Sequence, residues 1–144
     1  MPPEDRRVRR TRRLLRDALV SLVLERGYAG ITVEDITDRA DLGRATFYSH
    51  YTDKDDLLGQ VVSDLADDLQ ERLGPLIPAS SIGFTGKPVL EMFRHAAEER
   101  DVYRVILRGE GDGKALRKFV EDRSVAAVRI FSARAEALGV TPRI

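Results

Sequence analysis

The chain has 144 residues, of which 42% are hydrophobic and 33% charged, and its formal net charge at pH 7 is zero. This length allows one full-sized core but not two full-sized domains, and no apolar run approaches the roughly 20 residues of a membrane span. The lack of cysteine excludes disulfides, thiolate metal sites and cysteine nucleophiles, and the start of the chain lacks the apolar stretch of a signal peptide. We therefore expect a cytoplasmic protein without a membrane partner.

The zero net charge conceals an uneven distribution of charged residues. Seven arginines fall between Arg6 and Arg16, and this arginine segment contains no acidic residue. Residues 53–73 are instead mostly acidic among their charged side chains. Runs of charge are more often solvated surfaces than binding sites. Because this run is all arginine and leads directly into the short helices that follow it, we favour contact with a polyanion.

Three helices are predicted in the N-terminal third of the chain. Helical spacing of apolar residues predicts the first from about Arg7 to Arg26. The second follows Thr32, a suitable N-cap. After a tight break at Asp41–Gly43, the third runs from Arg44 to His50 or Tyr51. Two short helices joined by such a turn are typical of a helix-turn-helix, whose second helix enters the major groove of DNA.

A long fourth helix is predicted after Asp53, which is a good N-cap. Its apolar residues from Leu58 to Leu73 step almost strictly by four. The acids on its other side share one stripe, which we interpret as a solvated face rather than a catalytic cluster; they are Asp64, Asp67, Asp68 and Glu71.

The rest of the chain is also expected to be helical. Gly74 to Lys87 is rich in Gly, Pro and Ser and is predicted to be a connection. A fifth helix is expected up to Arg100, Asp101 is a predicted N-cap for a short sixth, and a seventh is expected to end at Gly139. We find no β run and no repeat. The predicted fold class is therefore all-α, with a three-helix DNA-binding domain over residues 1–52 and a helical-bundle regulatory domain over residues 53–144.

The third predicted helix divides into an inward and an outward face. Phe47 and Tyr51 lie one turn apart and can pack with Ile36 in a small core. The remaining side chains then face outward, and their types suit DNA: Arg for guanine edges, Thr and Ala for thymine methyl groups, Tyr and Ser hydroxyls for phosphate. For His50, a capping or packing role is the alternative. The predicted DNA-binding residues are Arg10, Thr32, Arg44, Ala45, Thr46, Tyr48, Ser49, His50 and Lys54.

The segment GYAGITVEDITDRADLGRATFYSHYTDKDDLL is similar to the N-terminal domain of the TetR family of transcriptional regulators. The matching positions are Thr32, Ile36, Ala40, Thr46, Phe47, Tyr48, Tyr51, Lys54 and Leu57. Two positions depart from the family pattern: Asp41 stands where the family often has Gly, and Gly43 where it often has a small polar residue. Residues 61–144 match only in helix order.

The resemblance implies a ligand-responsive repressor that binds a pseudo-palindromic operator in double-stranded DNA as a homodimer. We expect a small apolar or aromatic effector in a pocket with Tyr103 as its polar group, although the same residues could equally be core. The candidate pocket residues are Phe93, Ala97, Tyr103, Ile106 and Phe119.

The resemblance also carries an expectation about assembly. Dimers of the family usually rest on two further long helices, and the chain stops just after the predicted seventh helix. We therefore expect a regulatory domain that is incomplete at its C-terminus, with an apolar face exposed on the fifth and seventh helices.

Other functions fit the sequence less well. No nucleophile, nucleotide-binding or metal-ligand motif is present, so we expect neither an enzyme nor a bound metal or cofactor. A helical adaptor that binds only protein leaves the arginine segment and Tyr48 unexplained. A helix-turn-helix regulator without a small-molecule ligand remains a further alternative.

Overall fold

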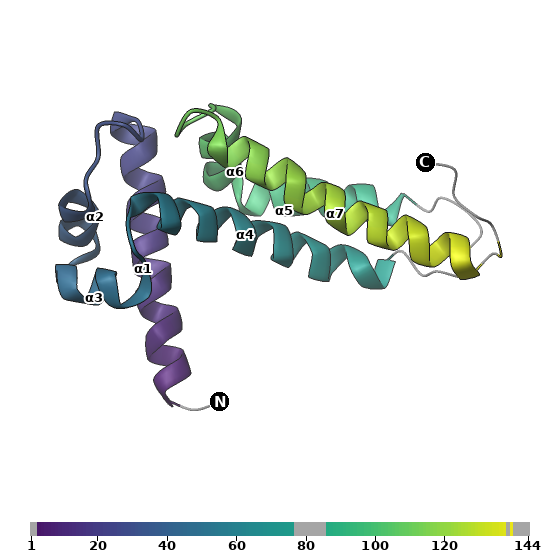
Figure 1. Cartoon of the computed structure of the whole chain (residues 1–144), viewed down its shortest axis with the longest axis horizontal. Helices are drawn as coiled ribbons and strands as arrows, with labels where there is room; N and C mark the ends of the chain where they lie inside the picture. The colour runs from purple at the N-terminus through teal and green to yellow at the C-terminus, as the bar shows by residue number, and fades with distance from the viewer. Residues whose placement is uncertain (1–2, 77–85, 138, 140–144) are drawn as a thin grey trace.

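The computed structural model describes residues 3–76, 86–137 and 139, and the described residues are helical with short turns. α1 (Pro3–Arg26) packs against α2 (Val33–Ala40), and α3 (Arg44–His50) follows beside α2, while the N-terminal half of α1 projects away from the body (Figure 1). α1 begins earlier than predicted, with proline at its first position, where the missing N–H costs nothing. The all-α prediction and the order of the three N-terminal helices are confirmed.

Local signals fix both ends of α2. At its start, Thr32 Oγ1 accepts from Asp35 N at 3.1 Å, and Asp35 Oδ2 accepts from Thr32 N at 2.9 Å, which is a complete capping box. At its end, Asp41 adopts a left-handed conformation with a φ of 55°. The N–H groups of Asp41 and Leu42 donate to the carbonyls of Asp38 and Thr37, the pattern of a Schellman motif. Asp41 therefore occupies the backbone position at which glycine is most common.

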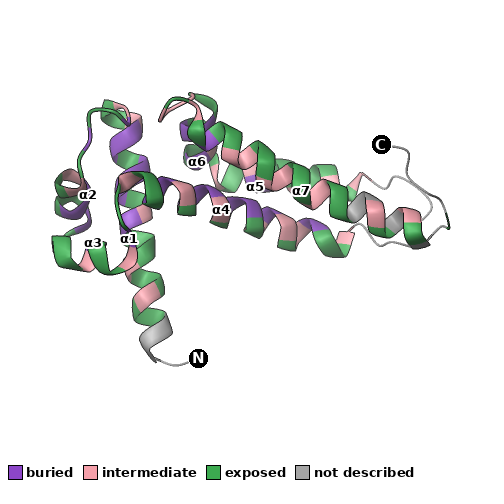
Figure 2. Cartoon of the chain, in the orientation of Figure 1, coloured by how far each residue is buried: buried purple, intermediate pink, exposed green. Residues whose placement is uncertain are grey.

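α4 (Lys54–Leu73) runs from the three N-terminal helices into the rest of the molecule. Asp53 is its N-cap, as predicted, because its side chain accepts from Asp56 N at 2.7 Å. The apolar stripe of α4 is buried along its whole length, from Leu57 to Leu73 (Figure 2). α4 thus contributes to the cores of both parts.

The remaining helices pack against α4 or α1. A short 3₁₀ turn, η1 (Gly74–Leu76), follows α4, and α5 (Lys87–Glu98), α6 (Arg100–Leu107) and α7 (Lys114–Ala137) complete the described chain. α7 runs alongside α4, and α6 reaches back to α1 (Figure 1). The predicted connection from Gly74 to Lys87 begins with η1, and its residues 77–85, like the chain end at Ile144, lie outside the described residues.

Two expectations about these helices have different outcomes. The cap predicted at Asp101 is wrong: α6 begins at Arg100, and Asp101 lies in its first turn, where a carboxylate suits the helix dipole. The exposed apolar face on α5 and α7 is confirmed, with Phe93 70% exposed and Val120 52% exposed. Within the described residues, no helix combines the length and the hydropathy that a membrane-spanning helix requires.

Candidate nucleic-acid interface

α3 has the inward and outward faces that the sequence predicts. Phe47 is fully buried and Tyr51 nearly so, with ring centroids 5.7 Å apart. Tyr48 packs edge-on against Phe47 at 5.2 Å, yet 55% of Tyr48 is exposed. The short helix is therefore held by a buried aromatic anchor while it presents a large polar aromatic side chain to solvent.

The other predicted α3 residues share this outward surface to different degrees. Arg44, Ala45 and Ser49 are exposed, whereas Thr46 and His50 are half-buried. The Ser49 hydroxyl donates to the Thr46 carbonyl at 2.7 Å, so it has an intrahelical partner as well as access to solvent. Gly43 precedes the helix in an extended conformation and provides no side-chain cap.

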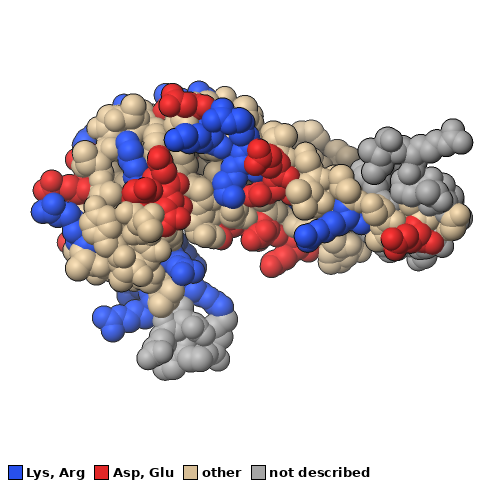
Figure 3. Space-filling model, in the orientation of Figure 1, with Lys and Arg blue, Asp and Glu red and all other residues tan. Residues whose placement is uncertain are grey.

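The arginine segment is only partly free to meet an external polyanion. Arg9, Arg12, Arg13 and Arg16 line a groove of about 360 Å³ between α1 and α4, and the same groove is lined by Asp64, Asp68 and Glu99. Arg16 forms an ion pair with Glu99. Arg10 is exposed, and basic side chains gather on the projecting half of α1 (Figure 3). Acidic residues that are distant in the sequence thus lie beside one face of the arginine segment.

Asp68 in the acidic stripe of α4 is partly exposed, as predicted, and it also has partners inside the protein. Asp68 Oδ2 lies 2.9 Å from His95 Nε2 and 3.1 Å from Arg72 Nε. His95 is fully buried, and its Nδ1 lies 2.9 Å from the Tyr103 hydroxyl. The sequence could not show this contact, because α5 brings His95 to α4 across the intervening connection.

Two predicted DNA-binding residues have partners inside the protein. Lys54 Nζ donates to the carbonyls of Tyr28 at 2.9 Å and Ile31 at 3.0 Å, and it lies 4.3 Å from the Tyr28 ring centroid. The Thr32 hydroxyl caps α2. Lys54 therefore fastens the start of α4 to the loop between α1 and α2, and its predicted phosphate contact stays a prediction.

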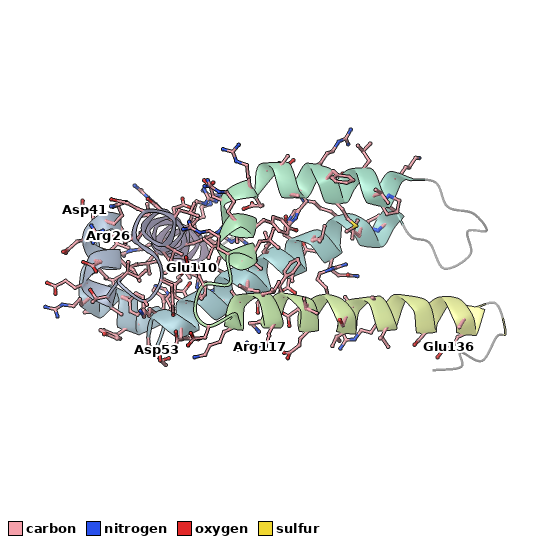
Figure 4. The ribbon with its side chains drawn as sticks, turned by 90° about the horizontal axis from the view of Figure 1, so that it is seen from above. Arg26, Asp41, Asp53, Glu110, Arg117 and Glu136 are labelled. Carbon is pink, nitrogen blue, oxygen red and sulfur yellow. The ribbon has the colours of Figure 1, made fainter. Side chains whose placement is uncertain are left out.

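The same loop is also held from the other end of the molecule. Glu110 lies in the turn between α6 and α7 (Figure 4). Its carboxylate accepts from Tyr28 N at 3.0 Å. The Tyr28 hydroxyl is hydrogen-bonded to Asp55, and burial together with this carboxylate raises the pKa of Tyr28. Lys114, at the start of α7, pairs with Asp55 at 3.8 Å. These contacts join α1, α4 and the α6–α7 turn at one point.

An open apolar groove of about 530 Å³ lies between α4, α5, α6 and α7. Three predicted pocket residues line it, namely Phe93, Tyr103 and Phe119, and the rings of Tyr103 and Phe119 meet edge-on at 5.6 Å. Leu69, Val89, Met92, Ala96 and Arg123 also line it and were missed.

Two other candidate pocket residues are not in the apolar groove. Ile106 is fully buried in the core, and Ala97 faces α1 beside Arg16. Tyr103 is not a free polar group either, because its hydroxyl is bonded to His95. Burial is the main cause that raises the pKa of Tyr103, so the phenol stays neutral.

The part of the chain that contains α2 and α3 is similar in sequence to known proteins. Residues 15–61 match the family described as bacterial regulatory proteins, tetR family. Over 59 residues, or 40% of this chain, the sequence is 48% identical to the HTH-type transcriptional regulator YxbF of Bacillus subtilis. Over 59 residues, or 41% of this chain, it is 37% identical to the HTH-type transcriptional repressor DhaR of a Mycobacterium species. These matches span only 16% and 30% of the length of the two relatives.

Solved structures show the same fold over most of the chain. A TetR-family structure from Syntrophomonas wolfei aligns with a TM-score of 0.69 and 18% identity, covering 93% of this chain and 72% of that one. A family member from Streptomyces coelicolor aligns with a TM-score of 0.60 and 26% identity, covering 90% of this chain and 67% of that one. Residues 15–61 of this chain therefore resemble the tetR family of bacterial regulatory proteins, and the chain shares its fold with these two solved structures.

Proposed function

We propose that this protein is a transcriptional regulator that binds a pseudo-palindromic operator through α3 as a homodimer, and that it represses transcription until a small effector binds. The observation that carries the proposal is the α3 surface, where a half-exposed Tyr48 stands on a fully buried Phe47 within the family-matched segment. Repression follows the relative DhaR, which is a repressor by name. A cytoplasmic location belongs to the same proposal, since operator DNA lies there in bacteria.

The chemistry of α3 divides the proposed contacts by type. Arg44 has the fork of donors that pairs with guanine edges, and Ala45 and Thr46 can contact thymine methyl groups. Tyr48, Ser49 and His50 are proposed to contact phosphates, which orient the helix without reading sequence. One such short helix buries little surface, so two of them, about 34–36 Å apart on a dimer, are needed to reach successive major-groove faces.

The arginine segment is proposed to contribute general attraction to DNA. Arg10 is the proposed phosphate contact, because it is exposed on the projecting half of α1. The groove lined by Arg9, Arg12, Arg13 and Arg16 is also lined by Asp64, Asp68 and Glu99, so the positive charge of these four arginines is partly compensated within the protein. We therefore expect fewer released counterions than seven arginines suggest.

Effector response is proposed to act through α4. This helix lines the apolar groove with Leu69 and begins at Lys54, whose ammonium group holds the loop before α2. A ligand that favours one tilt of α4 can therefore bias the position of the helix-turn-helix. Such coupling is typically about 1–3 kcal/mol and is reciprocal between the two ligands.

Fluorescence anisotropy with labelled promoter DNA at two salt concentrations tests the DNA-binding part. Tyr48→Ala is expected to weaken binding to all sequences, and Arg44→Ala to cost about 1–3 kcal/mol while relaxing the preference at one base pair. Arg104→Ala, on the exposed side of α6, is the matched control and should leave affinity unchanged. Wild-type affinity in both α3 variants would contradict the proposed interface.

A further inference from the structure

We propose that the apolar groove binds an amphipathic carboxylate, an alkyl or aryl acid whose carboxylate pairs with Arg123 and whose apolar part lies against Phe93 and Phe119. This inference rests on the effector response proposed above and names the chemical class of the effector. It adds Arg123, a residue outside the predicted set, as the determinant of that class.

The walls of the groove favour an apolar ligand body. Its volume of about 530 Å³ lies within the usual range of small-molecule sites. Phe93 is 70% exposed and Met92 is 47% exposed, so both lose contact with water when the groove is filled. Burying an aromatic or aliphatic side chain of this size contributes about 1.5–3 kcal/mol when burial is complete. The groove can therefore supply affinity but little orientation.

Arg123 is the charged side chain that lines the groove. It extends from α7 toward α4, where its Nη1 donates to the neutral amide oxygen of Gln70 at 3.1 Å. Among the described residues, no carboxylate forms an ion pair with Arg123 within 4.0 Å. Arg72, by contrast, is paired with Asp68 and Glu98. Arg123 thus offers unused donors beside an apolar surface, and its planar fork matches a carboxylate.

The Tyr103 hydroxyl, the second polar group of the groove, also favours Arg123 as the partner of the ligand's polar group. The Tyr103 hydroxyl is already bonded to buried His95, so a ligand that displaced it would leave a buried imidazole nitrogen without its partner. A polar ligand group is therefore better satisfied at the Arg123 end. A protonated amine placed there would be repelled, and an alcohol would gain a single hydrogen bond instead of an ion pair with two hydrogen bonds.

Isothermal titration calorimetry with octanoate, 1-octanol and octylamine, each below its solubility or micellar limit, tests the inference on the whole chain. We expect octanoate to bind at least about tenfold more tightly than the alcohol, which corresponds to about 1.4 kcal/mol, and octylamine to bind most weakly. Arg123→Gln should reduce octanoate affinity to that of the alcohol and leave the alcohol unchanged. Arg129→Gln, exposed farther along α7, is the matched control and should retain the preference.

Phe93→Ala tests the contribution of the apolar wall independently of that of Arg123. It should weaken octanoate and octanol by the same factor, because both lose the same apolar contact. A thermal melt of each variant checks that the fold is retained.

The possible failures are distinguishable. Equal binding of octanoate and octanol, or an Arg123→Gln variant that keeps the preference, overturns the carboxylate class while the groove remains an effector site. No binding of any of the three compounds overturns this inference and the effector response together, whereas the α3 variants test DNA binding separately. If light scattering shows self-association that Phe93→Glu abolishes, the groove is a contact between two copies and the inference is wrong.

Discussion

At the residue scale, the helix-turn-helix depends on a few side chains that satisfy backbone groups. Thr32 and Asp35 bind one another's backbone N–H groups at the start of α2, and Arg26 lies 3.7 Å from the Asp35 carboxylate. The backbone N–H of Thr32 is the main cause that lowers the pKa of Asp35, with the Thr32 hydroxyl and Arg26 acting in the same direction. The ionised form of Asp35 is thus tied to the folded state.

This linkage predicts an acid-dependent contribution to stability. Because the pKa of Asp35 is lower in the folded state than in the unfolded state, its contribution is present above the unfolded value of about 4 and is lost as pH falls through the folded value. Asp35→Asn should therefore melt at lower temperature than wild type at pH 7, with a difference that shrinks below pH 4. Asp38→Asn, exposed on the same helix, is the control. A constant gap between wild type and Asp35→Asn from pH 7 to pH 3 would contradict the linkage.

At the element scale, the features that could be predicted from the sequence are those set by residues close together in the chain, namely helix caps and apolar spacing. The apolar steps of α4, its Asp53 cap and the Thr32 cap of α2 are local patterns, and all three are confirmed. The two faces of α3 also follow from spacing, because Phe47 and Tyr51 are the residues that one buried face can hold.

Contacts that depend on how helices pack could not be predicted in this way. Ala97 lies one residue after Ala96, yet that step of about 100° turns it from the apolar groove toward α1. The roles of Asp68 and Arg123 depend on which faces of α5 and α7 meet α4, which no local pattern specifies. The buried and exposed faces of α3 could thus be predicted from the sequence, whereas the lining of the apolar groove could be predicted only in part.

Lys54 gives the sharpest prediction at this scale, because its structural and DNA-binding roles differ in a measurable way. Lys54→Met removes the ammonium group that bonds the carbonyls of Tyr28 and Ile31, so the melting temperature and operator affinity should both fall. If the role is positional, the slope of log affinity against log salt stays that of wild type. A direct phosphate contact would instead make the slope shallower by about 0.9. Arg10→Met, which removes a proposed phosphate contact, is the comparison that should change the slope.

At the scale of the whole molecule, the two parts are joined by more than α4. The α6–α7 turn meets the loop between α1 and α2, where Glu110 accepts from the backbone N–H of Tyr28. Gly111 in this turn has a φ of 66°, and a side chain built there would contact Leu58 and Tyr28 at 3.4 Å. The turn is therefore closely fitted to the start of the helix-turn-helix. α6 and α7 also wall the apolar groove. The α6–α7 turn therefore provides a second physical connection between the groove and the helix-turn-helix.

Glu110 tests whether this connection matters for DNA binding. Glu110→Ala leaves the Tyr28 N–H without its carboxylate partner, which costs about 1–3 kcal/mol when the group stays shielded from water. We therefore expect faster hydrogen–deuterium exchange in residues 27–31 and weaker operator binding, although Glu110 is not a proposed DNA contact. Glu110→Gln keeps an acceptor oxygen and should restore most of both properties, and Glu136→Ala, exposed near the far end of α7, should change neither. Faster exchange with unchanged operator affinity would mean that Glu110 holds the loop but that this contact does not position α3.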